Sequence, residues 1–325
     1  MTRWAVVGAR GAVGEVMLEC LKRAELVEPP TCFGSARSAG ATVEFDGNTL
    51  PVVPLDASSI GEFDVVLFSA GSAAAREWAP RFHAHGACVV DNSSAFRLDD
   101  DVALVVPEVN AAAIPEGPAI VANPNCSTII FLVAAAPLLQ LGEFSANVAT
   151  YQAVSGAGRE GIVALRRELR GEDAPDSPFA APIANNLIAQ IGTPSDDERG
   201  ETTEERKMRD ESRKILGRPE LSVITTCVRV PVERCHSEAV TLTFDREVSR
   251  ADAIECLRGA PGVQLQVDGD PPGPLDVAGR DDVFVSRVRQ PSSNVLQLWV
   301  VGDQLLKGAA LNAVQIAHAY LGATS

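Results

Sequence analysis

Cys126 lies in the part of the sequence with the clearest signature of covalent chemistry. It belongs to the run NPNCST at residues 123–128, directly before an apolar stretch over 129–141 that predicts a helix. Near a helix N-terminus, unpaired N–H groups and the positive end of the helix dipole lower the pKa of a thiol and favour the thiolate. The same amides, with the side chain of Asn125, can hold an oxyanion that forms next to the sulfur. The pattern predicts a nucleophile, and a buried cysteine at a helix cap is the alternative.

A nucleophilic cysteine usually has a histidine partner, and the chain has four histidines. His83 and His85 end a predicted helix, and His318 lies inside the last helical segment. His236 differs because it falls at the junction of two predicted strands, where connecting segments carry function. His236 is therefore the candidate partner of Cys126, with a purely structural histidine as the alternative.

A glycine-rich turn at residues 8–14, GARGAVG, predicts a dinucleotide site. It follows an apolar run at 4–7 and precedes a helical pattern with apolar positions 13, 16, 17, 18 and 21. Glycines at 8, 11 and 14 allow a tight turn in which backbone N–H groups approach a pyrophosphate at the helix N-terminus. We therefore expect Gly8, Arg10, Gly11 and Gly14 to lie at the cofactor, and a glycine turn without a ligand is the alternative.

The segment at 34–38 favours NADP over NAD. An NAD site needs an acidic residue about 20 positions after the turn, to bind the ribose 2′-hydroxyl. The chain instead has Arg37 flanked by Ser35 and Ser38, which suits a 2′-phosphate, although a solvated basic turn has the same composition. A second glycine motif, at residues 156, 158 and 161, is followed by a Pro/Asp-rich stretch and not by a strand, so no second βαβ unit is predicted.

The charge balance limits the partners that the protein can bind. The 325 residues carry 28 Lys and Arg against 43 Asp and Glu, a formal charge of −15, which disfavours nucleic acids and anionic membranes. An anionic substrate then needs basic side chains within a cleft. No leader and no apolar run of about 20 residues is present, so we expect a cytoplasmic protein. The seven scattered cysteines predict neither disulfides nor a metal site.

The spacing of apolar runs predicts two α/β domains. Short runs at 4–7, 31–34, 64–69, 87–90 and 103–106 alternate with helical stretches such as 72–84, as in a doubly wound parallel sheet of Rossmann type. Longer alternating strands at 146–154, 221–230, 238–245 and 295–301, with a loop and solvated helix at 194–214, predict an α+β catalytic and dimerisation domain. We assign residues 1–125 and 307–325 to the NADP domain and 126–306 to the second. The last segment predicts an amphipathic helix that packs on the first domain.

Eight motifs together resemble the aspartate-semialdehyde dehydrogenase family. They are GARGAVG at 8–14, NSSAFR at 92–97, VPEVN at 106–110, NPNCST at 123–128, YQAVSGAG at 151–158, EERK at 204–207, CVRVPVERCHSE at 227–238 and LLKGAALNAVQIA at 305–317. The resemblance covers essentially the whole chain. It implies a homodimeric enzyme that uses NADP to interconvert L-aspartate 4-semialdehyde plus phosphate and 4-phospho-L-aspartate, on the route to lysine, threonine and methionine.

The resemblance also implies roles for single residues. Cys126 is the nucleophile, Gln152 orients the aldehyde, and His236 is the acid–base residue. Arg229 contacts the substrate carboxylate and Glu204 its α-ammonium. Arg97 and Lys207 form the phosphate-binding pair. The cofactor contacts are Gly11, Ala12, Val13, Arg37, Ser38, Ser155, Gly156 and Asn312. A strand between Arg229 and His236 would span about 20 Å, so we expect a bend at Pro231 to bring them together.

Related enzymes fit these residues less well. N-acetyl-γ-glutamyl-phosphate reductase runs the same chemistry on a longer substrate, but Gly is expected there in place of Asn125. Glyceraldehyde-3-phosphate dehydrogenase prefers an acidic NAD residue, which is absent here. A non-catalytic NADP-binding relative would have lost the cysteine or the histidine. The chain departs from the family at Arg10, where a small hydroxyl residue is usual. It also departs in the loop at 192–201, whose Pro/Asp/Arg-rich composition is not typical.

Overall fold

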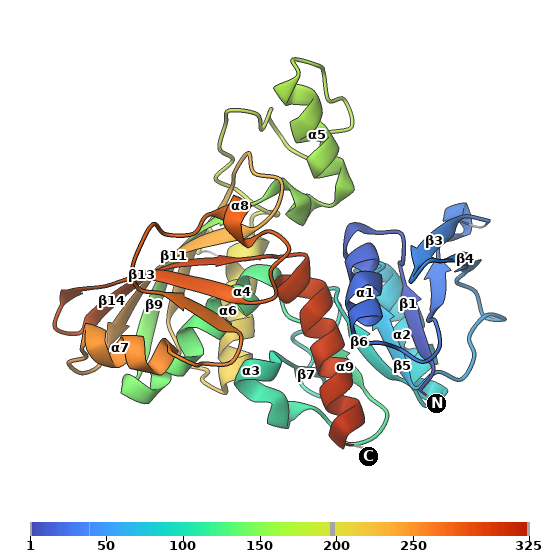
Figure 1. Cartoon of the computed structure of the whole chain (residues 1–325), viewed down its shortest axis with the longest axis horizontal. Coiled ribbons are helices and arrows are strands. Elements are labelled where there is room, and N and C mark those ends of the chain that lie inside the picture. Colours follow the sequence, from blue (N-terminus) through green and yellow to red (C-terminus); the bar gives the residue numbers. More distant parts are fainter. Residues whose placement is uncertain (1, 39, 196–198, 324–325) are drawn as a thin grey trace. The chain divides into compact units, whose positions relative to one another are not determined.

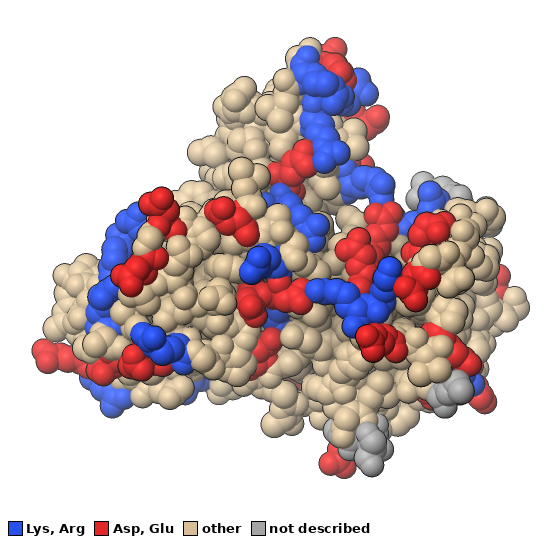
Figure 2. Space-filling model, in the orientation of Figure 1, with Lys and Arg blue, Asp and Glu red and all other residues tan. Residues whose placement is uncertain are grey.

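The computed structural model describes residues 2–38, 40–195 and 199–323, which form two compact units. Unit 1 comprises Met1–Pro124 and Ala309–Ser325, and unit 2 comprises Asn125–Gly308. No helix among the described residues is long and apolar enough to cross a bilayer. Acidic and basic side chains are interspersed over much of the visible surface (Figure 2), as expected for a chain with many charges of both signs.

Unit 1 is built on an eight-stranded sheet in the order β3-β4-β2-β1-β5-β6-β8-β7. All neighbouring strands are parallel except β3 and β4. Its strands are β1 (Trp4–Val7), β2 (Thr31–Gly34), β3 (Thr42–Phe45), β4 (Asn48–Pro54), β5 (Val65–Phe68), β6 (Cys88–Asp91), β7 (Ala103–Leu104) and β8 (Ile120–Ala122). Its helices are α1 (Ala12–Arg23), η1 (Ala36–Ser38), α2 (Ser72–Ala84), α3 (Pro107–Asn110), η2 (Ala111–Ala113) and α9 (Leu311–Ala323).

The strand order of unit 1 confirms the predicted doubly wound sheet. From β1 the chain moves outward to β2, and from β5 it moves the opposite way to β6. Because such crossovers are right-handed, α1 and α2 fall on opposite faces of the sheet (Figure 1). The carboxyl ends of β1 and β5 therefore form the point where ligands bind in this class of fold. Strands β1 and β5 are buried along their whole length, as their continuous apolar sequences predict.

Unit 2 is built on a six-stranded mixed sheet in the order β10-β9-β11-β14-β13-β12. Its strands are β9 (Phe144–Gln152), β10 (Val223–Arg229), β11 (His236–Phe244), β12 (Val263–Gln266), β13 (Val283–Ser292) and β14 (Val295–Gly302). Its helices are α4 (Cys126–Ala135), η3 (Ala136–Leu141), η4 (Val154–Ala157), α5 (Arg159–Leu169), α6 (Thr203–Leu216), α7 (Arg250–Leu257) and α8 (Pro274–Val277). A π-helical turn, η5 (Leu306–Ala310), precedes α9.

Alternation along the central strands places one set of side chains under the helices. In β9 the buried residues alternate with exposed ones, which is the pattern of a sheet with one covered face. Helices α4, α6 and α7 pack on this sheet, with α6 on the edge strand β10. The helix α5 and the irregular segment after it extend away from the sheet (Figure 1).

Two helices differ from the sequence expectation. The stretch around α6 was expected to be solvated, but α6 buries Glu204, Met208, Glu211 and Ile215 against α4 and β10. These positions recur every three or four residues and form one face of the helix. The sequence did not indicate this buried face, because two of its four residues are carboxylates in a highly charged stretch. Helix α9 was expected to be amphipathic, but it is buried on most sides between α1, α3 and strands β5 and β6.

Candidate active site

Cys126 is the first residue of α4, as the sequence predicts, and it is half-buried. Asn125 caps the helix: its Oδ1 accepts hydrogen bonds from the N–H groups of Ser127 at 3.0 Å and Thr128 at 3.3 Å. Its own backbone N–H donates to Glu211 Oε2 at 2.6 Å. These three amides therefore already have acceptors, and an oxyanion held at the start of α4 stays a prediction.

The amide nitrogen of Asn125 is also engaged. Its Nδ2 donates to Glu204 Oε1 at 2.8 Å, so this side chain joins the start of α4 to α6. The second carboxylate oxygen of Glu204 accepts from Lys207 Nζ at 3.1 Å. Glu204, expected at the α-ammonium of the substrate, and Lys207, expected at the phosphate, are thus direct neighbours on α6. The sequence reasoning missed Glu211, whose position seven residues after Glu204, two turns along the same helix face, was the available signal.

Three predicted site residues form one row at the end of the unit 2 sheet. Arg229, the last residue of β10, pairs in register with Gln152, the last residue of β9. His236 begins β11 on the other side of β9, where the next pair is Ser237 with Tyr151. We call Arg229, Gln152 and His236 the catalytic row. The row contacts the residue next to Cys126, because Gln152 Nε2 donates to the hydroxyl of Ser127 at 3.0 Å.

Gly156 shows how closely two members of the row approach each other. A Cβ on Gly156 would lie 2.7 Å from Arg229 Nη1 and 3.3 Å from His236 Cε1. Both side chains therefore border the space above Gly156, which confirms the predicted bend between them. The missing side chain of this glycine is what leaves room for them.

Arg229 is buried and held in place from two sides. Its Nη1 donates to the carbonyl of Ala153 at 2.6 Å, and its backbone pairs with Ile188 through two hydrogen bonds. Its positive charge interacts with Cys126 and Glu204. A cavity of about 530 Å³ opens beside it, lined otherwise by Gly192 and by mainly apolar residues, Ala157, Pro178, Phe179, Ala180, Ile188, Gln190 and Ile191.

His236 is fully buried, and its ring is fixed by a backbone group. The N–H of Ala153 donates to His236 Nδ1 at 3.0 Å. The Nε2 atom has no hydrogen-bond partner among the described residues. Burial, with the nearby positive charge of Arg229, lowers the pKa of His236 to about 3, so the ring is neutral at physiological pH. Ala153, which serves both Arg229 and His236 through its backbone, could not be found from side-chain chemistry.

A second polar row lies one step deeper on the same face of the sheet. Thr150 of β9 pairs with Cys227 of β10 on one side and with Glu238 of β11 on the other. Glu238 is fully buried, and neither carboxylate oxygen has a hydrogen-bond partner among the described residues. Burial raises the pKa of Glu238 well above its ordinary value, so this carboxyl group is held in its neutral form.

The predicted dinucleotide turn in unit 1 has the geometry that a pyrophosphate needs. Gly8 has a φ of +84°, and a Cβ there would overlap the carbonyl of Ser69, which comes directly after β5. A Cβ on Gly14 would overlap the carbonyl of Gly8. Helix α1 begins at Ala12 with Gly11 as its cap and without a side-chain hydrogen bond to its first amides. These amides therefore fit an anionic group, at the point where the strand order reverses.

The other predicted cofactor and phosphate residues of unit 1 lie in several places. Ser35 precedes the turn η1 after β2 and Ser38 is its last residue, and the side chain of Arg37 lies outside the described residues. Arg10 is exposed and lines a cavity between α1 and the β3–β4 hairpin. Arg97 is buried and donates to the carbonyls of Asn123 and Asn92. Asn312 of α9 is also buried, and its Nδ2 donates to Val105 O and Asn123 Oδ1.

Ser155 has a structural contact in unit 2 that the sequence did not indicate. It is buried, and its hydroxyl donates to the carbonyl of Glu233 and accepts from the amide of Gln304. Gln304 in turn accepts from the N–H of Cys235, the residue before His236. Ser155 thus supports the segment that carries His236.

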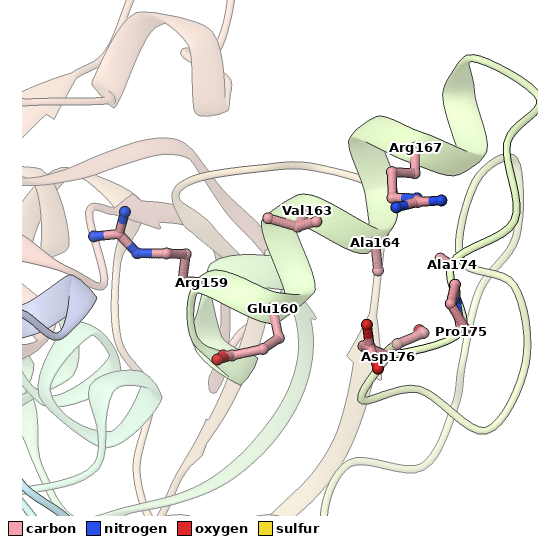
Figure 3. Close-up of a pocket in the computed structure, with 9 residues that line it drawn as sticks. Arg159, Glu160, Val163, Ala164, Arg167, Ala174, Pro175 and Asp176 are labelled. Atoms are coloured by element: carbon pink, nitrogen blue, oxygen red, sulfur yellow. The ribbon is translucent and has the colours of Figure 1, made fainter. Parts of the chain in front are cut away.

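One further pocket lies apart from these residues. Helix α5 and the turn at 174–177 border a pocket of about 210 Å³, with Ala164 facing Pro175 and Asp176 (Figure 3). None of the predicted site residues lines it. Within the described part of the chain, no cluster of three or more His, Cys, Asp or Glu side chains has the arrangement of a metal site.

Comparison with known proteins places this site in a family. Residues 3–116 match the description "Semialdehyde dehydrogenase, NAD binding domain", and residues 135–307 match "Semialdehyde dehydrogenase, dimerisation domain". An aspartate-semialdehyde dehydrogenase of Corynebacterium melassecola is 42% identical to the chain, over 98% of this chain and 99% of its own length. One of Bacillus subtilis is 43% identical, over 97% of this chain and 96% of its own length. The chain belongs to the aspartate-semialdehyde dehydrogenase family.

Solved structures agree with that assignment. Aspartate semialdehyde dehydrogenase II from Vibrio cholerae, complexed with ASA, matches with a TM-score of 0.94 and 40% identity, over 99% of this chain and 98% of that one. An aspartate semialdehyde dehydrogenase from Candida albicans with NADP matches with a TM-score of 0.78 and 25% identity, over 100% and 99%. The predicted family and its two-part α/β fold are confirmed.

Proposed function

We propose that this protein catalyses the reversible, NADP-dependent conversion of L-aspartate 4-semialdehyde and phosphate to 4-phospho-L-aspartate, with Cys126 as the nucleophile. The observation that carries the proposal is the meeting of a helix-start cysteine with the catalytic row. Gln152 contacts Ser127 beside Cys126, and Glu204 contacts Asn125 on its other side. The family to which the chain belongs has the same activity in its name.

The chain's own residues divide the substrate between them. Two opposite charges are needed for an amino-acid substrate: Arg229 for the carboxylate and Glu204 for the α-ammonium. A guanidinium offers two parallel donors to a carboxylate. Both side chains lie close to Gln152, because Gln152 pairs with Arg229 in the sheet and its Nε2 is 3.5 Å from Glu204 Oε1. The aldehyde carbon would then lie over Cys126, oriented by Gln152.

Covalent catalysis by Cys126 divides the reaction into two steps. The thiolate adds to the aldehyde and gives a thiohemiacetal, which is oxidised to a thioester. Phosphate then attacks the thioester and releases the acyl phosphate and the thiolate. Arg97 and Lys207 are the proposed phosphate contacts, as the resemblance implies, since an anion must be attracted locally by a chain of charge −15.

The glycine turn of unit 1 is the proposed site of NADP. Gly8, Gly11 and Gly14 keep side chains away from the start of α1, and Ser35, Arg37 and Ser38 come after β2, where an NAD site has an acid. Bound there, NADP accepts the hydride that the thiohemiacetal carbon gives up. Ala12, Val13, Ser155, Gly156 and Asn312 complete the proposed cofactor contacts.

A spectrophotometric assay tests the proposed function. The purified protein is given NADP⁺, phosphate and either L-aspartate 4-semialdehyde or the semialdehyde of N-acetylglutamate, and NADPH formation is followed by absorbance. We expect turnover with the first substrate and none in Cys126→Ala, whose thermal midpoint and NADP binding should equal those of the unaltered protein. Faster turnover of the N-acetylated substrate would overturn the assignment.

We also propose that two copies of this cytoplasmic enzyme form a homodimer through the open face of the unit 2 sheet. Residues 135–307 match a dimerisation domain, and the face opposite the catalytic row exposes Tyr151 and Ile224. Light scattering should give twice the 34.2 kDa of one chain, and Ile224→Glu should lower the measured mass. An unaltered protein with the mass of a single chain would contradict this interface.

A further inference from the structure

The glycine turn of unit 1 carries one charged side chain, that of Arg10. Strand β1 ends at Val7, which pairs with Phe33 of β2. Beyond the paired residues, the N–H groups of Gly8 and Ala9 both donate to the carbonyl of Phe33, at 2.9 and 3.2 Å. The turn therefore stays beside β2 up to residue 9, and Arg10 begins next to the segment that follows β2.

Arg10 shares a cavity with the chain that leaves this segment. Its side chain lines a cavity of about 540 Å³ between α1 and the β3–β4 hairpin, and Thr42, the first residue of β3, lines the same cavity. Thr42 comes directly after Ala41, whose N–H donates at 3.0 Å to the carbonyl of Ser38, the last residue of η1. Arg10 and the end of η1 therefore meet at this cavity.

The charges around the cavity leave Arg10 available to a ligand. The acidic side chains come from α1 and the hairpin and are those of Glu15, Glu19, Glu44 and Asp46. The second cation, Lys22 in the last turn of α1, forms an ion pair with Asp46 at 3.4 Å. Arg10 is exposed, and no hydrogen bond or ion pair joins its guanidinium to another residue within 2–38, 40–195 and 199–323.

The position of Arg10 is unfavourable for a cation in the ligand-free chain. Helix α1 begins at Ala12, and its first amides lack a side-chain cap. The N-terminus of a helix is its positive end, so a cation two residues before it is destabilising, whereas an anion bound there is stabilised. The guanidinium of Arg10 therefore gains a favourable interaction when an anionic ligand arrives.

We propose that Arg10 binds the 2′-phosphate of NADP, together with the turn that follows β2, and contributes to the preference for NADP over NAD. The inference rests on the proposed cofactor site at the glycine turn. The pyrophosphate fits the uncapped amides of α1 and needs no guanidinium. The 2′-phosphate is the other anionic group of NADP, and in folds of this class it lies after the second strand, where an Arg accommodates it. Arg10 borders that place from the side of β1.

Calorimetric titration of the full chain with NADP⁺ and with NAD⁺ tests this role, because the two cofactors share the pyrophosphate and differ in the 2′-phosphate. Arg10→Gln removes the charge and keeps much of the length of the side chain. We expect the affinity for NADP⁺ to fall about tenfold and that for NAD⁺ to change less than about twofold. An equal loss for both would make Arg10 a pyrophosphate contact, and no loss for either would make it a solvated residue. Each of these outcomes overturns the proposal.

Lys22→Gln is the matched control, since it removes one positive charge from the same cavity at the other end of α1. It should leave the affinity for both cofactors unchanged. A loss of NADP⁺ affinity equal to that of Arg10→Gln would mean that the overall charge of the cavity attracts the cofactor, and would also overturn the proposal.

The ligand-free proteins give a second readout that needs no cofactor. A cation is unfavourable at the start of a helix and favourable at its end. The thermal midpoint should therefore rise in Arg10→Gln and fall in Lys22→Gln, each by about 1–3 °C. A lower midpoint in Arg10→Gln would make Arg10 a structural residue of the turn and would contradict the proposal.

Failure of the proposed cofactor site would look different. An unaltered protein that binds NADP⁺ no more tightly than NAD⁺ would defeat the proposed NADP site itself. An unaltered protein that prefers NADP⁺, with the full preference kept in Arg10→Gln, would defeat only the role of Arg10.

Discussion

The chain contains two strand–glycine–helix turns that share a local pattern and differ in what their glycines make possible. In unit 1, β1 leads through Gly8 and Gly14 into α1, and both glycines press against backbone carbonyls. In unit 2, β9 leads through Gly156 and Gly161 into α5, and Gly156 instead faces two side chains, Arg229 and His236. The first turn packs closely against backbone and keeps side chains away from the start of α1, and the second leaves room for Arg229 and His236.

The difference arises from the element that comes after each helix. After α1 the chain enters β2, which lies parallel to β1 and completes a βαβ unit. After α5 the next strand is β10, and the chain first passes through the segment that pairs Ile188 with Arg229. The same local glycine spacing thus acquires its function from the next element in the sheet, which a short motif does not contain.

The largest effect on activity is expected beside the second turn, for Arg229→Leu. This substitution leaves the carboxylate of the bound substrate buried without a guanidinium partner. We expect the loss in kcat/KM for L-aspartate 4-semialdehyde to be about 2–5 kcal/mol. Arg229→Lys should restore only part of the loss, because an ammonium lacks the two parallel donors. Steady-state kinetics of both variants decides the point. A loss below about threefold in the Leu variant would mean that another group holds the carboxylate.

The next effect concerns Gly156→Ala. The new methyl group would meet Arg229 Nη1 at 2.7 Å and the His236 ring at 3.3 Å. Displacing either side chain by about 1 Å should lower kcat/KM by about 10²-fold. Gly61→Ala in an open loop of unit 1 is the matched control, since its nearest neighbour would be 3.7 Å away. Weaker NADP binding with unchanged kcat would mean that Gly156 serves the cofactor alone and does not position the two side chains.

A smaller effect is expected in unit 1 for Arg37→Ala. A hydrogen-bonded contact to the 2′-phosphate should contribute about 1.5–3 kcal/mol. The variant should therefore lose about tenfold or more of the preference for NADP over NAD, measured as the ratio of kcat/KM values. An unchanged ratio would show that the turn after β2 is only solvated.

The smallest effect on activity is expected for Glu238→Gln, which changes the pH dependence of stability. At pH values between the pKa of Glu in the unfolded chain and the raised pKa of Glu238, the folded chain keeps a proton that the unfolded chain has released. This contribution to stability is therefore present at low pH and is lost as pH rises, by about 1.4 kcal/mol per pH unit. Gln cannot ionise, so urea unfolding should show the variant gaining stability over the unaltered protein as pH rises above the pKa of Glu in the unfolded chain. A difference that is independent of pH would contradict a neutral buried carboxyl.

The sequence predicted the elements whose signals are local. The glycine turn, the helix over 72–84 and the helix start at Cys126 each depend on residues within one or two turns of the chain. The hairpin of β3 and β4, and strands β8, β12 and β13, were missed; β3, β8 and β12 are only three or four residues long, too short for their pattern to stand out. Short strands of this kind are specified by the neighbours they pair with, more than by their own residues.

The candidate site was only partly predictable for the same reason. Cys126 and His236 were found by residue type, and Gln152, Glu204 and Arg229 by resemblance. The capped amides of α4, the contact of Ala153 with His236 Nδ1 and the buried Glu238 arise from sheet register and from α6 packing. These are contacts between residues far apart in the sequence, which no local pattern contains.

The covalent intermediate on Cys126 offers the most direct test of the account. Without phosphate, the thioester formed from L-aspartate 4-semialdehyde and NADP⁺ has no acceptor other than water. We predict a burst of NADPH equal to the number of active chains, and a mass increase of one acyl group on the peptide that contains Cys126. Absence of the burst, or an adduct on any other residue, would contradict the assignment of Cys126 as the nucleophile.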